Sequence, residues 1–221
     1  MFGLDGFWVC IAVTALALAA VVYSEFRDRS SGVVGATAKV IASAAFLVAA
    51  VVVGAWRDFF GQSLFIALAW SFIGDVMLIA RGASLAFGLG LAAFLMSHVG
   101  YIMVFRMRGV DMTAVVVALA VLAIPAWLVW RWLERRVRGG MRTAVGLYIA
   151  VISAMVAFAV GTTAAVGLGV SAWPLVAALL FYASDLFVAR HRFVIKTPWN
   201  RAIGLPLYYA AQYAFIALLI P

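Results

Sequence analysis

The amino-acid sequence predicts an all-α polytopic membrane protein with eight transmembrane helices. Hydrophobic residues make up 68% of the 221 residues and charged residues only 11%, whereas soluble domains are about half apolar. Apolar runs of about 17 to 22 residues recur along the chain, each long enough to cross a hydrocarbon layer of about 30 Å. Short segments rich in Arg, Gly or Pro separate these runs, and none is polar enough to form a soluble domain.

The apolar runs define the expected spans. They cover residues 7–23, 33–54, 60–80, 84–105, 112–132, 142–161, 171–189 and 202–220. We therefore expect a single transmembrane domain over residues 1–221. No basic segment precedes the first run, so we interpret it as an uncleaved span and not as a signal peptide. Cys10 has no second cysteine to pair with, and we interpret it as an apolar filler of the first span.

Basic residues in the loops predict the orientation. The first, third, fifth and seventh loops carry twelve Arg and Lys residues, and the other loops carry three. The positive-inside rule places the twelve in the cytoplasm and both termini on the non-cytoplasmic side. The net charge of +8 is then explained by topology and headgroup contacts, so we expect no nucleic acid partner. The preference for Arg over Lys, with abundant Ala and Val, is typical of a GC-rich bacterial genome and favours the bacterial inner (plasma) membrane.

Two carboxylates lie inside apolar spans. Asp75 and Asp185 occur in matching segments, 72–81 and 182–190, which read aromatic residue, any residue, small residue, Asp, apolar run, Ala-Arg. An ionisable residue in a transmembrane span is costly and indicates a functional site. The next spans also correspond, because His98 follows Asp75 by 23 residues and Tyr208 follows Asp185 by 23. This spacing predicts an internal 4+4 parallel repeat, with the site at the interface of the halves.

Further polar side chains lie at similar or greater depth than the two Asp residues. They are Lys39, His98, Tyr101, Tyr208, Tyr209 and Gln212. If their helices are neighbours, these groups form a pocket open toward the cytoplasmic leaflet. Each group also has a purely structural interpretation. Lys39 can pair with a carboxylate or extend to the interface, Tyr208 and Tyr209 can form an interfacial belt, and His98 and Gln212 can bridge helices.

Other catalytic patterns are missing from the sequence. Ser71, Ser97 and Ser184 are more consistent with packing than with nucleophiles, because no Gly-x-Ser-x-Gly segment is present. The His, Cys and acidic residues offer no metal-ligand spacing, so we expect no metal and no cofactor. The Trp and Phe side chains are expected to face lipid or the interface for the most part.

Two buried carboxyl groups suit proton transfer. Removal from water favours the neutral form of a carboxyl group, and a neighbouring carboxylate favours it further. One group can then stay protonated near neutral pH while the other is ionised, and such a pair can act as acid and base. The same pair can bind and release a transported proton. These residues alone leave hydrolysis and transport both open.

The sequence resembles the YhhN family of integral membrane proteins, the lysoplasmalogenases. The resemblance covers essentially the whole chain and rests on Lys39, Gly74-Asp75, Phe87, Gly90, Ser97-His98 with Tyr101, Ser184-Asp185, and Tyr208-Tyr209 with Gln212. In one departure, Val40 stands where the family often has proline after the lysine. The resemblance implies the same eight-helix layout.

The resemblance also implies a reaction, the hydrolysis of the vinyl ether bond of lysoplasmalogens. The substrate would be a membrane lysophospholipid, and the products a fatty aldehyde and a glycerophospho-headgroup. Asp75 and Asp185 would be the catalytic general acid and base, in either order, and the other polar groups would orient them or bind the substrate. Arg81 and Arg190 are candidates for a phosphate contact. The alternatives are a proton-coupled small-molecule or lipid transporter and a non-catalytic membrane scaffold; headgroup preference and oligomeric state stay open.

Overall fold

The computed structural model describes residues 2–27, 32–80, 84–169 and 171–220, and within these ranges the chain forms eight α-helices and no strand. The helices are α1 (Phe2–Phe26), α2 (Val33–Val53), α3 (Phe59–Met77), α4 (Ser84–Met107), α5 (Met112–Leu133), α6 (Gly140–Val166), α7 (Trp173–Ala189) and α8 (Pro198–Ile216). A π-helical turn, η1 (Arg190–Val194), extends α7, and a 3₁₀ turn, η2 (Ala217–Leu219), follows α8. All eight described α-helices, that of α7 with η1 included, are long and apolar enough to cross a membrane, which confirms the predicted fold class.

Local signals fix several helix ends. The Asp58 carboxylate accepts a hydrogen bond from the Gly61 amide at 2.7 Å and caps the start of α3. Asp111 caps α5 in the same way, through the amide of Thr113 at 2.8 Å. Gly54 ends α2 with a φ of 108°, a conformation that favours glycine. Asp58 and Asp111 therefore have structural roles that explain their positions in the loops.

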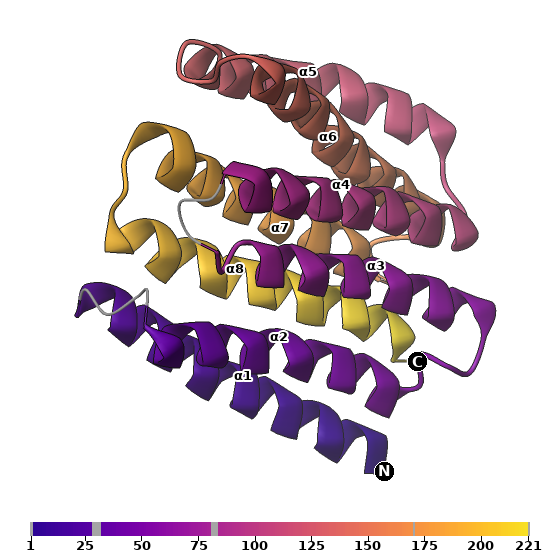
Figure 1. Ribbon diagram of the computed structural model, residues 1–221. Helices are drawn as coiled ribbons and strands as arrows, with labels where there is room; N and C mark the ends of the chain where they lie inside the picture. Colours follow the sequence, from indigo (N-terminus) through magenta and orange to yellow (C-terminus); the bar gives the residue numbers. More distant parts are fainter. Residues whose placement is uncertain (1, 28–31, 81–83, 170, 221) are drawn as a thin grey trace.

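Consecutive helices pack side by side as hairpins: α1 with α2, α3 with α4, α5 with α6, and α7 with α8 (Figure 1). Helix α8 lies centrally and contacts α1, α2, α3 and α7. Helix α5 lies at one edge of the bundle and packs mainly on α6 (Figure 1). Both chain ends lie at the same end of the bundle, while the internal repeat and the membrane orientation stay predictions.

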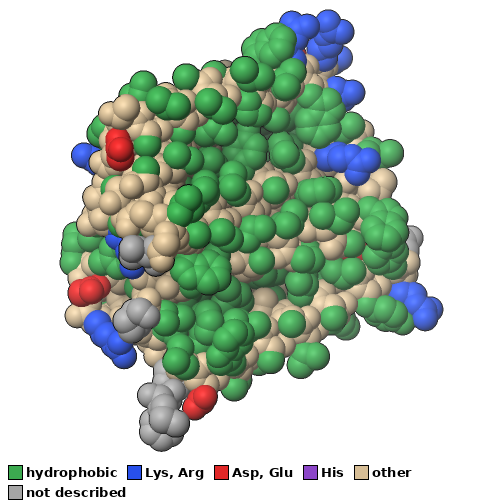
Figure 2. Space-filling model, turned by 180° about the vertical axis from the view of Figure 1, so that it is seen from behind, with side chains coloured by type: hydrophobic (Ala, Val, Ile, Leu, Met, Phe, Trp, Pro, Cys, Tyr) green, Lys and Arg blue, Asp and Glu red, His purple; other side chains and the backbone are tan. Residues whose placement is uncertain are grey.

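The outer surface is strongly apolar. Side chains such as Leu16, Trp8 and Val116 are mostly exposed, although they are hydrophobic. Figure 2 shows hydrophobic side chains over most of one face, with Lys and Arg gathered toward its margins. This distribution suits a bundle surrounded by lipid, where charged groups stay near the interfaces.

Small residues bring α3 and α4 close together. A Cβ atom on Gly100 would lie 2.8 Å from the Cβ of Ala67, and one on Gly74 would lie 2.7 Å from the ring of Phe94. Such contacts between small residues let membrane helices approach closely. Because Asp75 follows Gly74, this packing fixes the position of the Asp75 backbone beside α4.

Candidate active site

A cavity of about 780 Å³ lies inside the bundle, and each of the eight described helices contributes residues to its lining. Both Asp75 and Asp185 line this cavity, so the two carboxyl groups predicted to act together face one space. Lys39 and Tyr208 line it as well. The cavity extends to the bundle end formed by η1 and the start of α8. A volume of this size fits a site for a substantial organic ligand.

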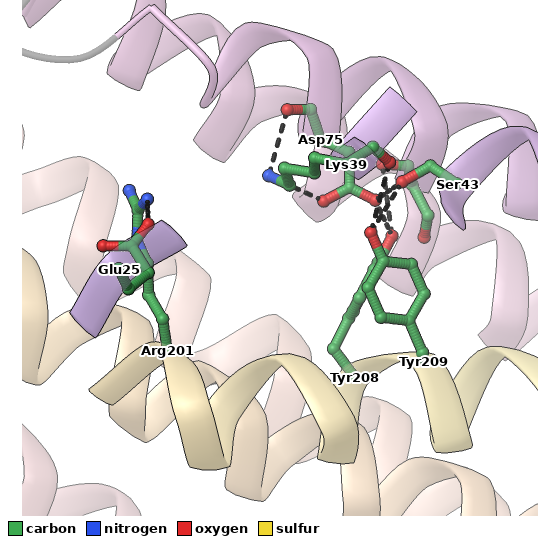
Figure 3. A network of polar contacts seen from close by, with 8 residues as sticks. Glu25, Lys39, Ser43, Asp75, Arg201, Tyr208 and Tyr209 are labelled. Carbon is green, nitrogen blue, oxygen red and sulfur yellow. Dashed lines mark hydrogen bonds and ion pairs between the residues drawn. The ribbon is translucent and has the colours of Figure 1, made fainter. Parts of the chain in front are cut away.

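Asp75 is surrounded by hydrogen-bond donors (Figure 3). Its Oδ1 atom lies 3.0 Å from the Nζ atom of Lys39. Its Oδ2 atom accepts hydrogen bonds from the hydroxyl groups of Ser43 at 2.7 Å and Tyr208 at 2.6 Å. The Asp75 side chain is only 4% exposed. An ammonium group and two hydroxyl donors thus surround the buried carboxyl group of Asp75.

Asp185 has a different environment. The Tyr148 hydroxyl donates a 2.7 Å hydrogen bond to its Oδ2 atom, and the Nε2 atom of His98 lies 3.6 Å from the same oxygen. Within the described ranges, no Lys or Arg side chain forms an ion pair with Asp185. The two carboxyl groups of the cavity therefore differ in their access to a compensating positive charge.

One contact of each Asp residue crosses between the halves of the chain. Asp75 of α3 contacts Tyr208 of α8, whereas Asp185 of α7 lies near His98 of α4. If α3 is matched with α7, and α4 with α8, the contact between Asp75 and Tyr208 corresponds to the contact between Asp185 and His98. The predicted duplication, in which His98 and Tyr208 hold corresponding positions, would give this arrangement, and it stays a prediction.

Aromatic rings pack between the two carboxyl environments. The ring of Phe181 lies 4.6 Å from that of His98 and 5.4 Å from that of Tyr208, measured between centroids. Phe94 packs against Tyr208 on another side, at 5.8 Å. The expectation that Phe side chains mostly face lipid is wrong for Phe94 and Phe181, which are buried beside the site. These rings hold the Tyr208 hydroxyl toward Asp75.

The other predicted residues form a buried layer behind the cavity wall. The Tyr101 hydroxyl donates to the Oε1 atom of Gln212 at 2.7 Å, and its ring stacks on Phe215 at 3.6 Å. Tyr209 shares a 3.0 Å hydrogen bond with Ser43. Tyr101, Tyr209 and Gln212, together with His98, are not part of the cavity lining. Their positions suit orientation of the lining groups.

The three serines considered as packing residues bond within the protein. Ser71 and Ser97 share a 2.7 Å hydrogen bond between α3 and α4. Ser184 donates to the Phe181 carbonyl one turn earlier in α7, at 2.8 Å. None of the three has a histidine hydrogen-bonded to its hydroxyl among the described contacts, which agrees with a packing role.

Sequence reasoning missed two direct partners of the carboxyl groups. Ser43 lies one turn after Lys39 in α2, on the same face of the helix. This spacing could have identified Ser43 from the sequence. Tyr148 lies near the start of α6, in a span that otherwise offered no ionisable side chain at depth. The only feature in the sequence that pointed to Tyr148 was its aromatic hydroxyl group within an apolar segment.

Charged residues collect where the cavity meets η1 and α8. Arg192, Lys196, Glu25 and Arg201 line this end, and the Glu25 carboxylate pairs with the Arg201 guanidinium (Figure 3). Arg190 instead donates to the Asn200 side chain and lies outside the main cavity lining. Arg81 lies outside the described residues. Positive charge thus exceeds negative charge at this end of the cavity.

Comparison with known proteins adds the family. The chain matches the YhhN family over residues 34–219. It is 32% identical over 157 residues to lysoplasmalogenase TMEM86A of Bos taurus, a match that covers 67% of this chain and 61% of that protein. It is 31% identical over 160 residues to a lysoplasmalogenase of Mycobacterium bovis, covering 70% of this chain and 57% of that protein.

The chain spans about three-fifths of the length of these relatives. No solved structure matches it. The family match begins at the start of α2 and ends in η2, so it includes Asp75, Asp185 and their contacting side chains, whereas Glu25 of α1 lies before it. The chain therefore belongs to the YhhN family.

Proposed function

We propose that this protein hydrolyses the vinyl ether bond of lysoplasmalogens inside the membrane. The observation that carries the proposal is that two carboxyl groups with different surroundings line one cavity. Asp75 has the ammonium group of Lys39 at 3.0 Å, and Asp185 has a tyrosine hydroxyl and a histidine instead. The names of the relatives support the same reaction.

The two environments suggest the roles. Asp185 lacks a paired Lys or Arg in the described ranges, so it is the group suited to carry a proton. It transfers that proton to the β-carbon of the vinyl ether and leaves an oxocarbenium ion at the α-carbon. Asp75, paired with the ammonium group of Lys39, takes a proton from the water that attacks this α-carbon. The product of this step is a hemiacetal.

Collapse of the hemiacetal restores both groups. The hemiacetal hydroxyl returns its proton to the Asp185 carboxylate as the carbonyl of the aldehyde forms. The bond from this carbon to the glycerol oxygen breaks, and protonated Asp75 gives its proton to the leaving oxygen. The sum is one vinyl ether and one water converted to one aldehyde and one alcohol, with the protein unchanged.

The shape and charge of the cavity suit a lysophospholipid. Leu91, Ile149 and Ile152 are among the apolar residues that line its interior, and they can pack against a hydrocarbon chain. Arg192 and Lys196 line the end at η1, where they can bind a phosphate. We propose that this end faces the cytoplasm of a bacterial inner membrane, as the loop charges predict.

Aldehyde release from a lysoplasmenyl lipid by purified protein in detergent tests the proposal. Asp75→Asn and Asp185→Asn should each lower the rate by about 100-fold or more, as expected for loss of an acid or base. Asp111→Asn is the matched control, because Asn also caps helices and Asp111 lies outside the cavity. Full activity of both cavity variants would refute the roles. Solute movement in sealed vesicles under a proton gradient, without aldehyde release, would indicate transport instead.

A further inference from the structure

A second hollow lies on the outside of the bundle, beside the cavity. It has a volume of about 460 Å³, and its lining residues come from α5, α7 and the first residue of η1. They are Leu128, Val129, Trp132, Leu186, Phe187 and Arg190. We call this hollow the outer groove. Apart from Arg190 its lining is apolar, and it opens on the side of the bundle where α5 lies.

The outer groove and the cavity share a wall. Val129 of α5 and Leu186 and Phe187 of α7 line both spaces. Each of these side chains is partly exposed and not sealed in a core. At this place, therefore, a layer of single side chains separates the carboxyl-containing cavity from the outer groove.

Helix α5 is suited to move at this wall. It lies at the edge of the bundle, packs mainly on α6, and has the smallest buried share of the eight described spans. Pro125 lies inside α5, one turn before Val129. A proline in a helix interior removes a backbone hydrogen bond and promotes a bend. The part of α5 that carries Val129 is thus held less tightly than the central helices.

Helix α7 changes geometry at the other side of the wall. It passes from α-helix into the π-helical turn η1 at Arg190, three residues after Phe187. Short π-helical turns are rare and often occur at functional sites. A proline in α5 and a π-helical turn after α7 therefore flank the shared wall.

We infer that this wall is a lateral portal through which the hydrocarbon chain of a lysolipid passes from the bilayer into the cavity. The inference rests on the proposed function and names the route of its substrate. A chain that lies among lipid tails can cross an apolar wall without entering water, whereas the charged end at η1 would expose it to water. The headgroup would meanwhile follow the interface toward Arg190, at the end of the outer groove, and Arg192, at the end of the cavity.

The portal can be tested by attaching a bulky group reversibly to a residue of the shared wall. Val129→Cys and Phe187→Cys are each treated with a benzyl methanethiosulfonate, which adds a ring through a disulfide. Modification should lower kcat/KM at least tenfold for a vinyl ether lysolipid with a 16-carbon chain. It should change kcat/KM less than twofold for a water-soluble analogue with a four-carbon chain, and dithiothreitol should restore both. Val121→Cys is the control, since Val121 is exposed on α5 but lines neither space. No effect on the long chain, or equal losses for both chains, would overturn the portal.

A binding measurement separates the portal from the reaction. A non-hydrolysable alkyl ether lysolipid with a diazirine in its chain is photolysed with the unmodified protein, and the labelled peptides are mapped. Labels at Leu128 and Trp132, which line the outer groove but not the cavity, support the portal even if no variant releases aldehyde, in which case the proposed function fails by itself. Labels confined to other helices contradict the portal even if the protein hydrolyses the lipid.

Discussion

The ammonium group of Lys39 lies 3.0 Å from a carboxylate oxygen of Asp75 and 3.1 Å from the carbonyl oxygen of the same residue. One side chain of α2 thus contacts both the charge of Asp75 and the backbone near the end of α3. The pair is nearly enclosed, with side chains that are 14% and 4% exposed. It therefore serves the fold as well as the proposed chemistry.

Replacing Lys39 with methionine should destabilise the protein and abolish activity. The change leaves the Asp75 carboxylate buried without its cation, which costs about 3–5 kcal/mol. We expect a lower unfolding midpoint in detergent and no aldehyde release. The double variant Lys39→Met/Asp75→Asn removes the uncompensated charge and should recover stability but not activity. An unchanged midpoint for Lys39→Met alone would contradict a structural role for the pair.

Replacing Tyr148 with phenylalanine should slow the reaction and leave the fold intact. The Tyr148 hydroxyl donates to Asp185, and this hydrogen bond strengthens as Asp185 loses its proton in the transition state. We expect kcat to fall about tenfold, with little change in KM or in the unfolding midpoint. Tyr23→Phe, on the exposed side of α1, is the control. Equal kcat values for Tyr148→Phe and the unmodified protein would show that the Tyr148 hydroxyl has no role in catalysis.

Gly74 and Gly88 make a matched pair for stability. A Cβ atom on Gly74 would lie 2.7 Å from the Phe94 ring, whereas one on Gly88 would have no neighbour within 4 Å. Gly74→Ala should destabilise the protein by about 1–3 kcal/mol, because α3 must move away from α4. Gly88→Ala should be neutral or slightly stabilising, since alanine is the better helix former. Unfolding midpoints in detergent compare the two directly, and equal values would mean that the α3–α4 contact yields without cost.

Labelling with a membrane-impermeant maleimide tests the orientation. Arg135→Cys lies in a loop predicted to be cytoplasmic, and Trp56→Cys in a loop predicted to be outside. Cys10 is buried, so the introduced thiol should dominate the signal. In intact cells Trp56→Cys should react, and Arg135→Cys should react only after permeabilisation. The opposite pattern would reverse the topology and place the charged end of the cavity outside.

The eight spans were predictable because the bilayer sets their length and chemistry. A hydrocarbon layer demands about 20 apolar residues with satisfied backbone groups, and this requirement leaves a clear sequence pattern. The end of α3 was placed too late, since the helix stops at Met77 while the apolar run continues to residue 80. Hydropathy shows which residues can lie in lipid, but it does not show at which residue a helix ends.

The rotation of each helix about its axis was harder to predict. A helix that is apolar on every side gives no pattern to show which face meets the cavity. Asp75 and Lys39 were identifiable because a charged side chain inside a transmembrane span is costly and therefore indicates a functional or structural role. The hydroxyl of Tyr148 carries no charge, so its direct contact with Asp185 had no comparable signal, and Tyr101 and Gln212 proved to lie behind the lining.

Each carboxyl group has a polar partner in the helix synthesised just before its own. Lys39 and Ser43 precede Asp75 by one span, and Tyr148 precedes Asp185 by one span. Each acidic helix thus has a partner already made when it leaves the ribosome, before α8 exists. Insertion of two costly side chains into the bilayer is thereby eased pair by pair, and the cavity is completed only when Tyr208 arrives with the last helix.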